Sequence, residues 1–89
     1  MNIKLELFGS SRDFSNKNFI EFNFKKKCTI KDLRNEILKF IDKKFNGNKS
    51  YKDLVSVSAF CSENNEIINN KYKINKDQKI GIIPPIGGG

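Results

Sequence analysis

The sequence predicts a single α+β domain in which one amphipathic helix packs across a mixed β-sheet. Three observations support this prediction. Runs of alternating apolar residues lie near both ends of the 89-residue chain, a capped amphipathic segment separates them, and no stretch is long and apolar enough to span a membrane. A chain of this length can bury one hydrophobic core and little more, so we expect one domain.

The N-terminal part of the chain is expected to form two strands. In residues 3–8, apolar side chains alternate with Lys4 and Glu6, which is the pattern of a half-buried strand. In residues 19–24, every second residue from Ile20 is apolar. We therefore expect the two runs to pair as a hairpin with a long connection.

The clearest helix of the sequence follows. Thr29 is a good N-cap, and Asp32 stands three residues later, in the position of a capping box. Gly47 is expected to end the helix. The apolar residues recur at spacings of three and four, at Ile30, Leu33, Ile37, Phe40, Ile41 and Phe45.

The second half of the chain is expected to supply the remaining strands. Val55, Val57 and Ala59 alternate with serines, which predicts a strand through about Phe60. A short edge strand is expected within residues 67–74.

A last strand is expected from Lys79 to Ile83, after a turn in which Asn75 or Asp77 takes a left-handed conformation. Pro84 ends it, because proline cannot donate to a sheet. Two strands, a helix and then further strands is the order of the β-grasp, or ubiquitin-like, fold. In that fold the first and last strands lie parallel at the centre of the sheet, and here both are strongly apolar.

The composition excludes several classes of function. The chain has no histidine, and Cys28 and Cys61 are too far apart in sequence for a paired-cysteine motif, so we expect neither a metal site nor a self-contained hydrolase. The net charge of +7 comes from 15 lysines and only two arginines, beside 12 asparagines. An AT-rich coding sequence produces this bias without a partner, and readers of nucleic acid favour arginine. We therefore expect no nucleic-acid partner, no membrane and a cytoplasmic location.

The last ten residues carry no charged side chain, although 30% of the chain is charged. Pro84 and Pro85 stiffen the segment and direct it away from the domain. Three glycines then present bare backbone and a terminal carboxylate, which can enter a narrow tunnel of another protein. We therefore divide the chain into a domain, residues 1–83, and a tail, residues 84–89.

Three segments of the chain resemble the small subunit of molybdopterin synthase, in the MoaD group of the MoaD/ThiS sulfur carriers. They are LELFGSSRD near the start, TIKDLRNEI at the helix, and IGIIPPIGGG at the end. The resemblance covers the whole chain. The double proline argues against a thiamine-pathway carrier. The family's two acidic residues before the last strand are replaced here by Gln78 and Lys79.

The resemblance implies a non-catalytic subunit that carries sulfur. An E1-like adenylyltransferase would use ATP to adenylate Gly89, and a sulfurtransferase or other persulfide donor would convert Gly89 to a thiocarboxylate. The chain would bind no cofactor tightly itself. Its tail would enter the large subunit of molybdopterin synthase, where cyclic pyranopterin monophosphate becomes molybdopterin, the ligand of the molybdenum cofactor. The residues expected at the reacting end are Gly88 and Gly89, and those expected to bind partners are Phe8, Ile83, Pro84, Pro85, Ile86 and Gly87.

Other interpretations remain open at this point. Phe8 is either part of a partner-binding patch or part of the core, and Arg12 is expected to make a structural contact. The chain could carry sulfur for thiamine synthesis or tRNA thiolation, or it could be a ubiquitin-like modifier that is attached to lysines through Gly89. A small basic nucleic-acid binder is a further alternative, but it would leave the uncharged tail unexplained, and the sequence has no recognisable RNA or DNA motif.

Overall fold

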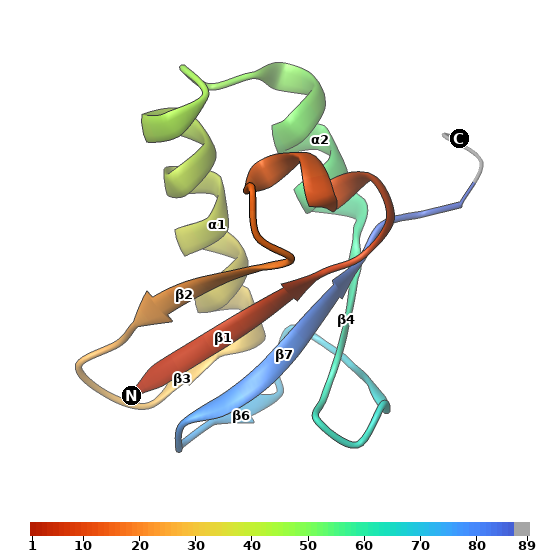
Figure 1. The fold of residues 1–89 in the computed structure, drawn as a ribbon. Helices are drawn as coiled ribbons and strands as arrows, with labels where there is room; N and C mark the ends of the chain where they lie inside the picture. The colour runs from red at the N-terminus through yellow and green to blue at the C-terminus, as the bar shows by residue number, and fades with distance from the viewer. Residues whose placement is uncertain (87–89) are drawn as a thin grey trace.

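A five-stranded mixed sheet forms the centre of the computed structural model, which describes residues 1–86 (Figure 1). Its strands are β1 (Asn2–Leu7), β2 (Phe19–Asn23), β4 (Ala59–Cys61), β5 (Ile67–Ile68) and β7 (Gln78–Ile83). Their order is β2-β1-β7-β4-β5, with β1 parallel to β7 and the other pairs antiparallel. The first and last strands therefore lie parallel at the centre, as predicted.

Two further short strands form a separate ladder, which lies behind the lower parts of β1 and β7 in Figure 1. They are β3 (Cys28–Thr29) and β6 (Lys73–Ile74), and they pair antiparallel. The expected short edge strand is thus confirmed, but as two strands, β5 and β6, that belong to different sheets.

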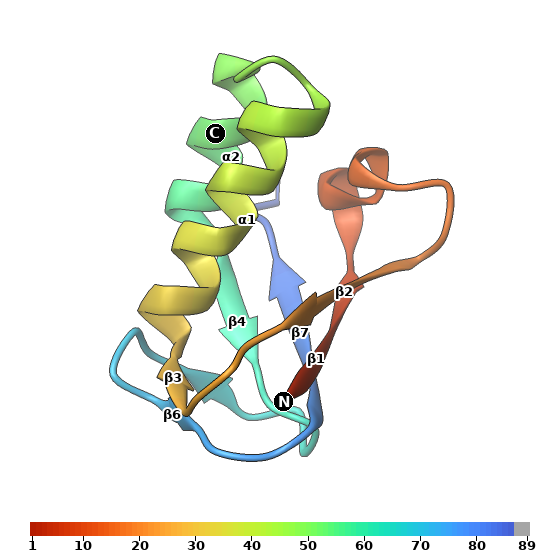
Figure 2. The ribbon, with the colours of Figure 1, turned by 90° about the vertical axis from the view of Figure 1, so that its left-hand side faces the viewer.

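Helices cover one face of the main sheet, and Figure 2 shows the two α-helices side by side. They are α1 (Ile30–Lys44) and α2 (Lys49–Val57), and a 3₁₀ segment, η1 (Gly9–Phe14), lies where a loop was expected. The core between the layers consists mainly of aliphatic side chains, with two aromatic ones, Phe14 and Phe60. Its fully buried aliphatic members include Ile3, Leu5, Leu7, Leu33, Ile37, Ile41, Ile80 and Ile82.

The start of α1 is the predicted capping box. The backbone N–H of Asp32 donates to Thr29 Oγ1 at 3.3 Å, and the backbone N–H of Thr29 donates to Asp32 Oδ2 at 2.9 Å. The helix ends at Lys44, and Asn46 and Gly47 then take positive φ values of 53° and 70°. A glycine is well suited to this left-handed position, so both ends of the helix were predictable.

The predicted strand from Val55 to Phe60 is wrong in its first part, because that part belongs to α2. Asn48 caps this helix by accepting a hydrogen bond from the N–H of Tyr51 at 3.1 Å. Val55 is buried and Val57 is 65% exposed, whereas a strand would place both on one face.

The serines that suggested alternation serve the helix instead. Ser56 and Ser58 donate their hydroxyls to the carbonyls of Lys52 and Leu54, four residues earlier. Only Ala59–Cys61 remain as strand.

The left-handed residue expected at Asn75 or Asp77 is also wrong. Among the described residues other than glycine, positive φ values occur only at Asn46 and Asn65. Asp77 acts through its side chain, since Oδ1 accepts a hydrogen bond from the N–H of Asn2 at 2.7 Å. That bond ties the turn to the start of β1.

Candidate functional site

The outer face of the main sheet, opposite the helices, is apolar where the tail leaves it. Side chains alternate between faces along a strand, so the neighbours of the core residues point outward. We call the residues gathered there the tail-side patch: Phe8, Ala59, Cys61, Ile67, Gly81 and Ile83. The register brings them together, because Ala59 lies opposite Ile83, and Cys61 lies opposite both Gly81 and Ile67.

Phe8 lies in this patch and not in the core, so the core role that the sequence left open is excluded, while its role in binding a partner stays a prediction. Its side chain is 36% exposed. A Cβ atom added to Gly81 would lie 2.9 Å from Phe8 Cε2 and 2.7 Å from Cys61 Sγ. The Phe8 ring and the Cys61 sulfur therefore lie directly on the backbone of Gly81, in space that only a glycine leaves open.

The turn after β1 holds Phe8 in place. Gly9 has a φ of 55°, a conformation that favours glycine. Ser11 donates both its hydroxyl and its backbone N–H to the carbonyl of Phe8, at 2.6 and 3.2 Å. The backbone of Phe8 is thus fixed from one side while its ring rests on the sheet.

Charged residues border the patch on the same face. Lys79 Nζ lies 3.7 Å from Glu6 Oε1, and Lys4 Nζ lies 4.2 Å from the ring centre of Phe19. Lys79 stands where the resemblance leads one to expect an acid, and here it pairs within the chain. The tail-side patch is therefore an apolar area whose border includes the Lys79–Glu6 ion pair. Protein interfaces commonly have an apolar centre and a polar rim of this kind.

The tail departs from the edge of this patch (Figure 1). Ile83 is half-buried and Pro84 is buried, with its ring 3.8 Å from where a Cβ on Gly9 would lie. Pro85 is exposed and Ile86 is 99% exposed. The exposed tail thus begins at Pro85, and Pro84 anchors it to the domain. The predicted roles of Gly87, Gly88 and Gly89 lie outside the described residues.

The chemistry of the described residues is limited. Burial, and then the charge of Asp32, raise the pKa of the Cys28 thiol, so this thiol stays protonated at neutral pH and is a poor nucleophile. Within residues 1–86, no three His, Cys, Asp or Glu side chains are close enough to hold a metal ion. No helix in that range has the length and apolar character needed to cross a membrane.

The two arginines differ from expectation. Arg12 is exposed on η1, and within residues 1–86 it makes no ion pair or side-chain hydrogen bond, so the structural contact expected of it is absent.

Sequence reasoning missed Arg34. Its guanidinium donates to the carbonyls of Val55 and Ser58 at 2.7 and 2.9 Å, and its Cζ lies 4.7 Å from the ring centre of Phe60. Arg34 thereby fixes the junction from which β4 carries Ala59 and Cys61 into the patch.

No protein-family model and no curated protein matches the chain. Solved structures do match. SAMP1 from Haloferax volcanii aligns over all of both chains with a TM-score of 0.69 and 13% identity. This chain has the ubiquitin-like β-grasp fold. A protein from Pyrococcus furiosus, assigned as subunit 1 of molybdopterin converting factor, aligns over 96% of this chain and 98% of its own, with a TM-score of 0.69 and 18% identity. The likeness to MoaD/ThiS carriers is thus confirmed at the level of this β-grasp fold.

Proposed function

We propose that this β-grasp protein is a sulfur carrier of the MoaD type. One observation supports the proposal above all. An uncharged Pro-Ile-Gly-Gly-Gly segment follows Pro84, which is anchored beside an exposed apolar patch. A carrier needs this combination, because its terminal carboxylate must enter the active site of another protein while the domain docks outside.

The chemistry would take place at the carboxylate of Gly89. An E1-like adenylyltransferase would join it to AMP from ATP with release of pyrophosphate. The outer sulfur of a persulfide donor would then attack the acyl-adenylate, which releases AMP and forms an acyl disulfide. A second thiol would reduce that disulfide, so that a thiocarboxylate and a new disulfide between the donor and the thiol would result. In the full proposal, the large subunit of molybdopterin synthase receives this tail and transfers its sulfur to cyclic pyranopterin monophosphate. The described residues would contribute docking and orientation and no catalytic group.

The tail-side patch would supply the docking energy. Full burial of one large apolar side chain contributes about 1.5–3 kcal/mol. Phe8 and Ile67 are 36% and 69% exposed, so each has surface left to bury in a complex. Rigid anchors cost less entropy on binding than mobile ones, and Phe8 is already held by Gly81 and Ser11.

A second candidate function is a protein modifier that is joined to lysines through Gly89. The likeness to SAMP1 fits this alternative as well as it fits a carrier. A sulfur carrier for tRNA thiolation or thiamine synthesis is a third candidate. All of them share the activated C-terminus and differ in its acceptor.

Binding to the large subunit of molybdopterin synthase tests the pathway. We expect the purified chain to bind it with measurable heat by titration calorimetry, and we expect Phe8→Ala to weaken that binding. A wild-type chain that shows no binding, together with high-mass conjugates of a tagged chain in cell lysate, would favour the modifier.

A further inference from the structure

Seven lysines lie near the end of the molecule away from the tail, around the loop before β3 and around β6 (Figures 1 and 2). Within residues 1–86, none of the seven forms an ion pair, whereas Lys39, Lys49, Lys52 and Lys79 each do. We call this group the lysine end. Its members are Lys25, Lys26, Lys27, Lys31, Lys71, Lys73 and Lys76.

The fold brings these lysines together from two distant stretches, residues 25–31 and 71–76. Thr29 lies opposite Lys73 in the β3–β6 ladder. The contact continues into the start of α1, where the N–H of Lys31 donates to the carbonyl of Asn70 at 3.1 Å. Two lysine-rich stretches that are separate in sequence therefore form one surface.

Few carboxylates balance this surface. The nearest in sequence are Asp32, which is engaged in the capping box, and Asp77, which accepts from the N–H of Asn2. The seven lysines outnumber these two carboxylates by five. The N-terminus of α1, which is the positive end of the helix dipole, lies at the same end of the molecule and adds to the positive potential.

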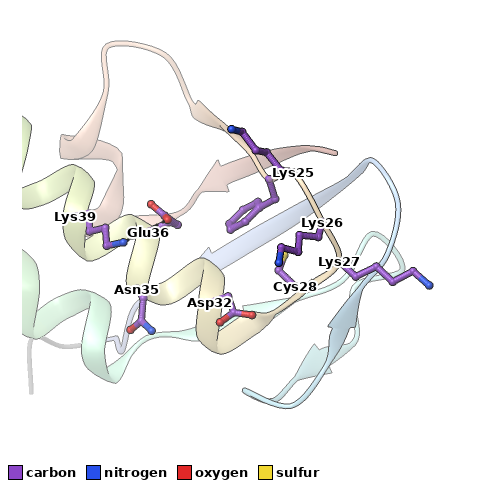
Figure 3. A pocket seen from close by; sticks show the side chains of 9 residues that line it. Lys25, Lys26, Lys27, Cys28, Asp32, Asn35, Glu36 and Lys39 are labelled. Carbon is purple, nitrogen blue, oxygen red and sulfur yellow. Dashed lines mark ion pairs between the residues drawn. The ribbon is translucent and has the colours of Figure 1, made fainter.

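The surface is hollowed as well as charged. One hollow of about 400 Å³ is lined by Lys25, Lys26, Lys27 and Lys39, with Asp32, Asn35 and Glu36 on the helix side. A second, of about 370 Å³, is lined by Lys27, Lys73 and Asn75 and shares Cys28 and Asp32 with the first. In Figure 3 the side chain of Lys27 extends away from Asp32, so its ammonium group is free to meet a ligand.

The groups present favour an acidic protein segment over a nucleic acid. Phe24 and Tyr72 are partly buried against the core, and the lysine end includes neither an arginine nor an exposed aromatic ring for base stacking. The carboxylates of an acidic segment can reach separate lysines, and the amides of Asn35 and Asn75 can donate to them.

We propose that the lysine end binds an acidic segment of a partner protein. Flexible ammonium groups attract such a segment over distance and speed the encounter. The tail-side patch and the tail lie away from this surface, so the chain can hold the acidic partner while its tail is occupied. The proposal does not depend on sulfur transfer.

The test uses a short fluorescein-labelled poly-glutamate peptide as the probe and a triple variant that neutralises the lysine end. Lys25→Gln, Lys27→Gln and Lys73→Gln together should weaken peptide binding by about 5- to 100-fold at low salt, because each of the three lost pairs contributes a factor of about two to five. The matched control, Lys17→Gln, Lys43→Gln and Lys49→Gln, has the same net charge and should change it less than about twofold. Circular dichroism confirms that both variants are folded.

Changes in the NMR chemical shifts of backbone amides locate the peptide-binding site in the wild-type protein. On peptide addition, we expect the NMR shifts to concentrate in residues 25–32 and 70–77. Three results would overturn the proposal: no binding at low salt, equal losses in the two triple variants, or tighter binding of an RNA oligomer that carries the same number of charges.

Discussion

The two ends of this molecule differ in charge, in packing and in what they can bind. At the tail-side patch, the neighbouring charges are paired and an aromatic ring lies on a glycine. At the lysine end, the charges lack ion-pair partners among residues 1–86 and the surface is hollowed. The difference shows that the net charge of +7 says little about the tail, because most of it lies elsewhere. One small domain can therefore offer two surfaces of different chemistry.

The largest effect is expected from removing the reacting end. Deletion of Gly88 and Gly89 should abolish thiocarboxylate formation, because the activated carboxylate would be displaced from the catalytic centre of its enzyme. Circular dichroism and binding of the poly-glutamate peptide should be unchanged. A truncated chain that still accepts sulfur would contradict the role proposed for Gly88 and Gly89. A truncated chain that no longer binds the peptide would show that the tail and the lysine end are not independent.

Phe8→Ala should reduce affinity for the tail-binding partner by about 10- to 100-fold, because truncating an aromatic anchor of an interface commonly costs about 2 kcal/mol. Calorimetry with the large subunit measures this. The matched control is Lys25→Gln at the other end, which should leave that affinity unchanged. An equal loss in the two variants would show that the two surfaces act together.

Gly81→Ala tests how Phe8 is positioned. The added methyl would meet Phe8 and Cys61 at less than 3.0 Å, so we expect a loss of about 1–3 kcal/mol in the free energy of unfolding. Urea unfolding measures it. In a Phe8→Ala background the loss should be smaller, since one of the two clashes is gone. Strict additivity of the two changes would mean that Phe8 does not rest on Gly81.

The smallest effect is expected at the capping box, which shapes the lysine end. Thr29→Ala should lower the free energy of unfolding by about 1 kcal/mol, because the N–H of Asp32 loses its acceptor. Thr29→Ser keeps the hydroxyl and serves as the control. Urea unfolding compares the three proteins, and an alanine variant as stable as the serine variant would contradict the role of this cap.

Much of the fold was predictable because local signals agreed with the tertiary structure. The alternation around Lys4 and Glu6, and the cap at Thr29, each correspond to an element with the expected position. The prediction failed at α2, because its last residues belong to Val-Ser-Val-Ser-Ala, which reads as a strand, while the helical signal of α2 is weaker. That signal is Asn48 as a cap, followed by Tyr51, Leu54 and Val55 at helical spacing.

The candidate site was predictable where it adjoins the tail and, through the resemblance, at Phe8. Ile83 directly precedes the tail, and Pro85 and Ile86 belong to it, so their positions were evident from the sequence. Gly81 was missed, because its role depends on a ring and a sulfur from two other strands. The lysine end was missed for the same reason, since the β3–β6 pairing joins stretches that no local pattern connects.

The central claim is that Gly89 becomes a thiocarboxylate, and the intact mass of the protein tests it most directly. The purified chain is incubated with ATP, an E1-like adenylyltransferase of the molybdopterin pathway, a persulfide donor and a thiol reductant, beside a variant that lacks Gly89. We predict a mass increase equal to one oxygen replaced by one sulfur in the full chain alone. An unchanged mass, with enzymes shown to be active on a known carrier, would contradict the claim.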